Sequence, residues 1–271
     1  MATDALDSAS SLATADTGRI RPLKRLLIAL CVLVFVVFQG MGGDQHFTMA
    51  WSTVPAEILS GKDLVTADQA VRDPASGQTY VLPGLQPTPV SVYLTLLASM
   101  FMHGGIAHLL GNLLYLWIFG DNIENRLGHG RYLLFYLLVG VIASLAFIAS
   151  TAAFGGDTAI PSLGASGAIA GVLGAYLLLY PKRRVRMLLG RAIVDVPAIA
   201  AVGLWFVFQL VAGLGQLGGG SDGVAYAAHI GGFIAGLVLV RPFAAGRASD
   251  GASQRTFGPR GGPPGGGWMP G

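Results

Sequence analysis

The stretch Pro161 to Gly171, PSLGASGAIAG, sets one serine among three glycines at the start of an apolar segment. Only fifteen residues, 167–181, separate Ser166 from the basic cluster that begins at Lys182. A helix that starts at this serine is too short to cross the roughly 30 Å hydrocarbon core of a bilayer. Non-helical backbone at such a depth is tolerated only where protein or a water-filled cavity surrounds it. The stretch therefore predicts a short helix that starts inside a membrane, with Ser166 at the floor of a cavity.

The composition of the whole chain also indicates a membrane protein. Of its 271 residues, 53% are hydrophobic and only 11% are charged, which is too little polar surface for a soluble domain of this size. The net charge of +3 is too small to indicate a nucleic-acid partner. The single cysteine, Cys31, lies in an apolar run, so no intrachain disulfide can form.

Six apolar segments approach the length needed to span a bilayer. We place them at 23–42, 106–124, 131–153, 165–181, 192–213 and 224–242. The first resembles a signal peptide, but no small-residue cleavage site follows Val37, which favours a retained span. With the N-terminus in the cytoplasm, fifteen of the seventeen Lys and Arg residues fall inside, leaving Lys62 and Arg72 outside. The sequence therefore predicts an all-α, multi-pass membrane protein with six spans and both termini in the cytoplasm.

The spans divide the chain into three regions. Residues 1–22 form a cytoplasmic N-terminal segment, residues 23–243 form the six-span domain, and residues 244–271 form a tail of Gly, Pro and Arg. The tail has too few apolar residues to fold and is expected to be disordered. A long outer loop, about 44–103, joins the first two spans.

Polar residues within spans are costly in lipid and are therefore candidates for function. His108 and Asn112 are four residues apart and share one face of a helix, while His103 precedes two glycines and belongs to a loop or first turn. A zinc site is disfavoured because there is no H-E-x-x-H motif and no nearby cysteine. Hydrogen bonds that only tie helices together are the structural alternative.

Ser166 and His229 form the candidate catalytic pair. Serine between glycines is also a common helix-packing device, and a histidine in a span can be a packing residue. However, Ser166 would lie on the first turn of a helix, where unpaired N–H groups and the helix dipole can stabilise an oxyanion. The direct Ser166-Gly167 pair and the absence of a preceding strand exclude the G-x-S-x-G elbow of soluble hydrolases.

Small residues would let the helices that carry the pair approach closely. They are Gly167 and Gly171 on one helix and Gly232 and Gly236 on the other. At hydrogen-bond distance, a neutral His229 could take the Ser166 proton and later return it to a departing amine.

No acidic residue completes the pair. The aspartates to be considered all lie at predicted helix ends or in loops, and they are Asp121, Asp157, Asp195 and Asp222. A Ser-His dyad is therefore favoured over a Ser-His-Asp triad, and an aspartyl protease, which needs two carboxylates sharing a proton, is disfavoured.

Four motifs together are similar to those of the rhomboid intramembrane serine proteases. HGGIAHLLGN, GASG and AHIGGFIAG fall on the second, fourth and sixth spans, and ENRLG follows the second span as E-x-R-x-G. The resemblance covers roughly residues 90 to 242. It implies a six-helix bundle around a cavity open to the outside, without metal or cofactor, in a bacterial inner membrane. It also implies substrates that are membrane proteins, mostly single-pass, and it leaves the individual substrate and the oligomeric state open.

The resemblance also implies roles for individual residues. Ser166 corresponds to the nucleophile and His229 to the general base. His108 and Asn112 correspond to side chains that face the oxyanion together with the Ser166 amide. The remaining two matches are Gly164, which shapes the serine loop, and His103, which has a supporting role.

Two positions depart from many relatives of this kind. The chain reads VSVYLTLLASM where many have Trp-Arg before the second span, and Ala170 stands where some place an aromatic ring to stack on the base. Hydrogen bonds made by that arginine must then come from elsewhere or be missing. A rhomboid-like protein that binds helices without cutting them, or a transporter with broken helices, are the alternatives. Intact Ser166 and His229 disfavour the first, and the absence of a sequence repeat disfavours the second.

Overall fold

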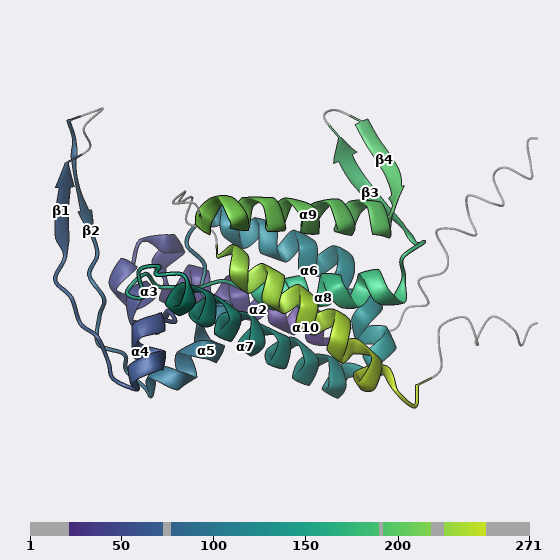
Figure 1. Ribbon diagram of the computed structural model, residues 1–271, viewed down its shortest axis with the longest axis horizontal. Helices are drawn as coiled ribbons and strands as arrows, with labels where there is room; N and C mark the ends of the chain where they lie inside the picture. Colours follow the sequence, from purple (N-terminus) through teal and green to yellow (C-terminus); the bar gives the residue numbers. More distant parts are fainter. Residues whose placement is uncertain (1–21, 73–76, 190–191, 218–224, 248–271) are drawn as a thin grey trace, which may run out of the picture.

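The structure, a computed structural model, describes residues 22–72, 77–189, 192–217 and 225–247. The predicted disordered tail lies outside these residues from position 248 onward, and so does the N-terminal segment up to residue 21. Within the described ranges the chain is a helical bundle with two β-hairpins projecting from it (Figure 1).

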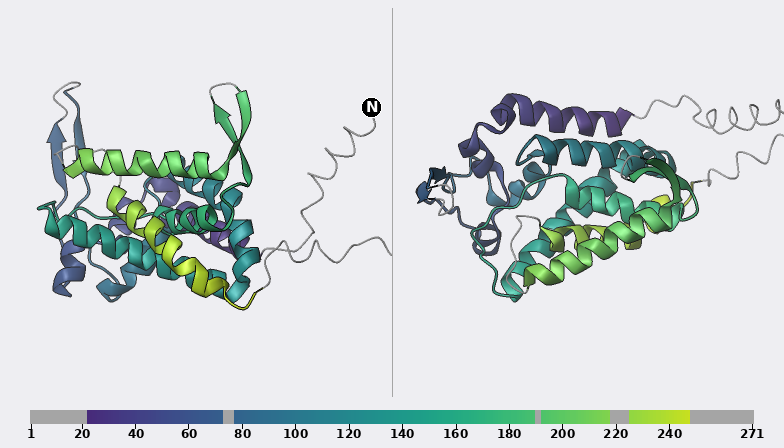
Figure 2. Two further views of the ribbon diagram at one scale, coloured as in Figure 1. Left: turned by 45° about the vertical axis from the view of Figure 1, so that its right-hand side comes forward. Right: turned by 90° about the horizontal axis from the view of Figure 1, so that it is seen from above.

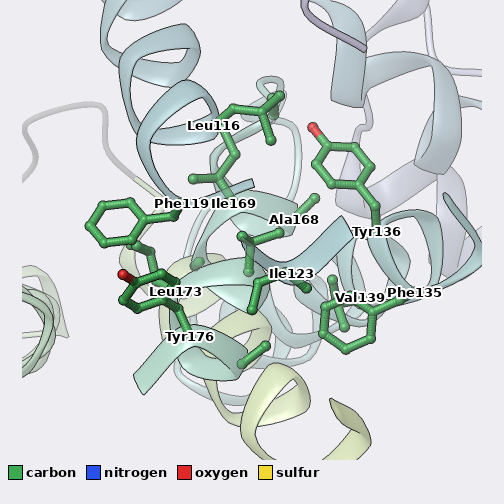
Figure 3. Packing of buried hydrophobic residues seen from close by; sticks show 14 of the residues in the cluster. Leu116, Phe119, Ile123, Phe135, Tyr136, Val139, Ala168, Ile169, Leu173 and Tyr176 are labelled. Atoms are coloured by element: carbon green, nitrogen blue, oxygen red, sulfur yellow. The ribbon is translucent and has the colours of Figure 1, made fainter. Parts of the chain in front are cut away.

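Six long helices form the bundle. They are α2 (Pro22–Leu33), α6 (Ile106–Leu127), α7 (His129–Ala153), α8 (Ser166–Leu179), α9 (Ala198–Leu217) and α10 (Tyr226–Ala244). Viewed from above, α2 runs along one edge of the bundle and α9 along the opposite edge (Figure 2). Helix α8 is the central one, because every residue from Gly167 to Tyr176 is buried. Figure 3 shows its side chains Ala168, Ile169 and Leu173 among apolar residues of α6 and α7.

The segment that joins α2 to α6, residues 34–105, is the outer segment. It contains several short elements rather than one extended loop. Five lie near its two ends, namely a π-helical turn η1 (Val34–Phe38), η2 (Gly40–Gly42), α3 (Gln45–Trp51), α4 (Pro55–Ser60) and α5 (Thr95–Ala98). Two 3₁₀ turns flank α5, and they are η3 (Val92–Leu94) and η4 (Ser99–Phe101). The first predicted span accordingly ends earlier than position 42. Three glycines follow it, and Met41 adopts a left-handed φ of 57°, so the helix cannot continue.

The structure corrects the predicted fifth span. Residues 192–197 form a strand, β4 (Ala192–Pro197), which pairs antiparallel with β3 (Arg184–Leu189), and helix α9 begins only at Ala198. In this strand the polar Asp195 stands between the two valines Val194 and Val196, opposite Arg186 on β3. Period-two alternation favours a strand, and a carboxylate is costly inside a bilayer. A second hairpin, β1 (Gln69–Arg72) with β2 (Thr79–Leu82), extends from the outer segment (Figure 1).

Three described helices are by themselves long and apolar enough to cross a membrane, namely α7, Ala198–Gly215 of α9, and α10. The segments Val92–Phe101 and Ile106–Leu127 add a fourth if they count as one span bent by 79°. Helix α8 has 14 residues, as the PSLGASG stretch predicts, and is therefore about 21 Å long. The count of six spans stays a prediction.

Helices α8 and α10 approach each other through glycines, as the small-residue pattern predicts. A Cβ added at Gly236 would lie 2.6 Å from the carbonyl carbon of Gly171 and 2.7 Å from its Cα. A Cβ at Gly232 would lie 3.0 Å from the carbonyl carbon of Gly167. Real Cβ atoms do not approach backbone so closely, so only glycine permits this distance between the helices.

The E-x-R-x-G motif joins three helix ends at the end of the bundle opposite the outer segment. The buried Glu124 carboxylate accepts hydrogen bonds from the backbone N–H groups of Leu23, at 3.2 Å, and Lys24, at 2.9 Å, and so caps α2. His129 Nδ1 lies 2.6 Å from the same carboxylate. Arg126 donates to the backbone carbonyls of Ala244 and Arg247, both at 3.1 Å, and so holds the end of α10.

Lys24 itself is buried at 2% exposure, although the sequence groups it with flanking basic residues. Its ammonium forms an ion pair with Asp121 at 2.8 Å and lies 3.8 Å from the centre of the Trp117 ring. Both partners lie on α6, so this lysine fastens α2 to α6.

Candidate active site

A cavity of about 1010 Å³ lies among α6, α7, α8, α9 and the start of α10. It is also lined by the non-helical segment that leads from α7 to Ser166. That segment carries Phe154 and Ile160, whose side chains are 68% and 52% exposed, so the cavity wall reaches the surface of the protein. Ser166, His229, His108, Asn112 and Gly164 all line this one cavity.

Ser166 and His229 are in hydrogen-bond contact. Ser166 is the first residue of α8, and its Oγ lies 2.7 Å from His229 Nε2 on the first turn of α10. The glycine contacts described above bring the two helices close enough for this distance. For the serine hydroxyl to donate to Nε2, the imidazole must carry its proton on Nδ1. The roles of nucleophile and base remain predictions.

Nδ1 of His229 has a partner that the sequence analysis missed. Gln209 Oε1, on α9, lies 2.7 Å from it, and the Gln209 side chain is only 5% exposed. Two aromatic rings flank the imidazole, with the Trp205 centroid at 6.2 Å and that of Tyr226 at 6.4 Å. Trp205 therefore provides an aromatic neighbour for His229 where Ala170 provides none. The sequence did contain a signal for Gln209, because it is an amide inside the apolar run WFVFQLVAG and polar groups in spans are costly.

His108 and Asn112 lie across the cavity on α6. Nδ2 of Asn112 donates one hydrogen to the backbone carbonyl of His108 at 3.1 Å, and an amide nitrogen carries a second hydrogen. The His108 ring packs against Gly164, where an added Cβ would lie 2.8 Å from ring atoms Cε1 and Nε2. Gly164 also has a φ of 122°, a left-handed conformation that favours glycine. The close packing of His108 and the backbone conformation of Gly164 therefore both require glycine at this position.

His103 is placed differently from the other predicted site residues, because it does not line the cavity. It lies in the break before α6, is fully buried, and packs edge-on against His108 with ring centroids 5.3 Å apart. Its backbone N–H and C=O both bond to the side-chain amide of Gln39 at 2.9 Å. His103 therefore lies behind His108 rather than in the cavity wall.

The outer segment holds the serine loop in place. Thr53 and Ser162 exchange backbone hydrogen bonds of 3.0 and 2.8 Å, and Thr53 Oγ1 lies 2.9 Å from Ser99 Oγ. The amide of Gly164 donates to the Ser99 carbonyl at 2.8 Å, and that of Ala56 donates to Thr158 at 2.9 Å. These bonds fasten the loop in a chain that lacks the Trp-Arg pair.

Comparisons with known proteins point to one family. A family model described as Rhomboid domain matches residues 91–245. The Rhomboid protease GluP of Bacillus subtilis (strain 168) is 38% identical over 150 residues, which cover 54% of this chain and 26% of that protein. Rhomboid protein 1, mitochondrial, of Saccharomyces cerevisiae is 33% identical over 171 residues, covering 59% of this chain and 44% of that protein. The human presenilin-associated rhomboid-like protein, mitochondrial, is 30% identical over 142 residues, or 49% and 37% of the two chains. The chain thus spans less than half the length of each relative.

Proposed function

Because this chain belongs to the rhomboid family of intramembrane serine proteases, we propose that it is an intramembrane serine endopeptidase acting through a dyad of Ser166 and His229. One observation carries the proposal, namely the 2.7 Å separation of Ser166 Oγ and His229 Nε2 in the cavity. Such a pair can divide peptide hydrolysis into acylation and deacylation.

In the first step, Ser166 Oγ attacks the scissile carbonyl carbon while its proton moves to His229 Nε2. The carbonyl oxygen then carries a negative charge. The amides of the first turn of α8 have no intrahelical partners, and the second N–H of Asn112 can also face this oxygen, with His108 beside it. Collapse of the intermediate breaks the C–N bond, and His229 returns its proton to the leaving amine. A water molecule, deprotonated by the same imidazole, hydrolyses the ester and restores Ser166.

The proposed substrates are transmembrane or juxtamembrane segments of membrane proteins, most of them single-pass. Members of this family are integral membrane proteins that act on membrane-protein substrates in the bilayer. A carbonyl locked in a helix is not accessible to a nucleophile, so a substrate must unwind locally before attack, and sequences with small or helix-breaking residues unwind most readily. The wide cavity around Ser166 has space for such an unwound segment.

The proposed location is a bacterial inner membrane, with both termini in the cytoplasm. In this orientation the cavity mouth and the β1–β2 hairpin face the outside, and the β3–β4 hairpin with Arg184 and Arg186 faces the cytoplasm. The excess of Lys and Arg on one side of the spans supports this assignment.

The test is cleavage of a fluorogenic single-pass substrate in proteoliposomes. We expect Ser166→Ala and His229→Ala each to abolish cleavage, and a metal chelator to leave the rate unchanged. A fluorophosphonate probe should label the wild-type protein and not Ser166→Ala. Cleavage that survives in Ser166→Ala would refute the mechanism. Substrate binding without cleavage by the wild-type protein would favour the helix-binding alternative.

A further inference from the structure

Helix α9 contacts the rest of the bundle along a narrow stripe. Ala198, Val202 and Gln209 are buried on it, while most of its apolar side chains are exposed, among them Leu204 at 69% and Val211 at 64%. The buried positions recur at helical spacing and so lie on one face. An amide at the centre of this face needs a hydrogen-bond partner, because burying a polar group without one is costly.

The partner of this amide is His229, and the contact determines which nitrogen of the imidazole carries the proton. Gln209 Oε1 can only accept a hydrogen bond, so at 2.7 Å it selects the tautomer with hydrogen on Nδ1. Nε2 then keeps a free lone pair, and Nε2 is the atom that lies 2.7 Å from Ser166 Oγ. The opposite tautomer would present N–H to the serine and could not accept its proton.

We propose that Gln209 is a positioning residue for the base, which makes the dyad a Ser-His-Gln relay extending over α8, α10 and α9. The inference rests on the proposed function, and Gln209 acts only through His229. Trp205 lies one helical turn before Gln209 on the same helix and adds a ring beside the imidazole. Displacement of α9 from the bundle would remove both contacts from His229. The base is therefore correctly oriented only while α9 is packed in place.

A neutral amide in this position has a specific chemical consequence. An aspartate in the third position of a serine protease both orients the histidine and stabilises its protonated form. Gln209 can orient the ring but carries no charge to stabilise an imidazolium. The other titratable side chains lining the cavity are His108, Tyr115 and Asp157, and none of them has a hydrogen bond to His229 among the described residues.

Two substitutions of Gln209 separate positioning from packing. Gln209→Met keeps a similar volume and removes the acceptor, whereas Gln209→Glu keeps the acceptor and adds a charge. Leu210→Met, at a neighbouring position that is 38% exposed, is the matched control. For each variant, kcat, KM and the pH dependence of cleavage are measured in proteoliposomes, together with the rate of fluorophosphonate labelling.

We expect Gln209→Met to lower kcat and the labelling rate together by at least about tenfold, with KM unchanged, because part of the imidazole shifts to the unproductive tautomer. Gln209→Glu should retain activity at high pH. Its low-pH limb should move to higher pH, because a carboxylate beside Nδ1 favours the protonated imidazole. Leu210→Met should match the wild type in every measurement.

The inference would be overturned if Gln209→Met kept the wild-type kcat, or if Gln209→Glu left the pH profile unchanged. Both results are what a residue that only fills space would give. This failure is distinct from failure of the proposed function. If only the inference about Gln209 fails, Ser166→Ala is inactive while the Gln209 variants behave like the wild type. If the proposed function fails, Ser166→Ala itself still cleaves.

Discussion

Gly236→Ala should separate the two helices that carry the dyad. The new Cβ would lie 2.6 Å from the carbonyl carbon of Gly171, against an ordinary contact of about 3.5 Å between carbon atoms. The obstructing atoms belong to backbone and cannot rotate away. Relief requires α8 and α10 to move apart by at least about 0.9 Å, because the Gly171 carbonyl oxygen lies closer still to the new Cβ. If the movement reaches the dyad undiminished, the 2.7 Å contact between Ser166 Oγ and His229 Nε2 lengthens beyond hydrogen-bond range.

Gly236→Ala should therefore have a larger effect on the cleavage rate than on the unfolding free energy. Misplacing a reacting group by about 1 Å can lower a rate by roughly 100-fold, whereas overpacking a core typically costs about 1–3 kcal/mol of unfolding free energy. Cleavage of the fluorogenic substrate in proteoliposomes reports the first quantity. Thermal unfolding in detergent micelles reports the second, and fluorophosphonate labelling measures how reactive Ser166 is in the folded fraction.

Two other glycines make this a graded series. Gly203→Ala on α9 is the control, because among the described residues no atom beyond its own helical turn lies within 4 Å of the added Cβ, and its activity should stay within about twofold of the wild type. Gly171→Ala should have an intermediate effect, because its Cβ meets mainly the side chain of Val139, which can adjust. A folded Gly236→Ala protein that cleaves at the wild-type rate would show that close helix packing does not set the dyad distance.

Three further outcomes are expected. Gly164→Ala should lower kcat at least about tenfold in the same cleavage assay, because its Cβ would displace the His108 ring and its φ of 122° disfavours a side chain. Glu124→Gln should lower the unfolding free energy measured in micelles by about 1–3 kcal/mol, since buried partners lose the carboxylate that caps α2. The pKa of Asp68 is lowered by the Gly84 amide and then by His46, so the stability it adds is lost as pH falls through the folded-state pKa. The protection factor of the Gly84 amide against hydrogen exchange should therefore fall in acid, and Asp68→Asn should remove this pH dependence.

The sequence predicts the features of this site that depend on local spacing. Fifteen residues between Ser166 and the basic cluster were enough to predict a short helix starting below the membrane surface, and α8 has 14 residues. Glycines four residues apart on two helices predicted their close approach. Both patterns can be interpreted from the sequence because each depends on the geometry of a single helix, whose rise per residue and periodicity are fixed.

Features that depend on pairing between distant segments could not be predicted. The bonds between Thr53 and Ser162 join residues 109 positions apart, and neither residue stands out in its own segment. Gln209 has no motif spacing to Ser166 or His229, so its contact with His229 became visible only when α9 was placed beside α10. The strand β4 was hidden because its apolar residues continue into those of α9.

The Glu124 cap has a consequence for any minimal catalytic fragment. The match to the family model begins at residue 91, yet two of the groups that bond to Glu124 are the amides of Leu23 and Lys24, and Thr53 holds the serine loop. A polypeptide trimmed to the matched region would keep every motif residue, but it would lose the two α2 amides that donate to Glu124 and the Thr53 hydrogen bonds that hold the segment before Ser166. The packed unit described here therefore includes residues from Pro22 onward, well ahead of residue 91, where the match to the family model begins.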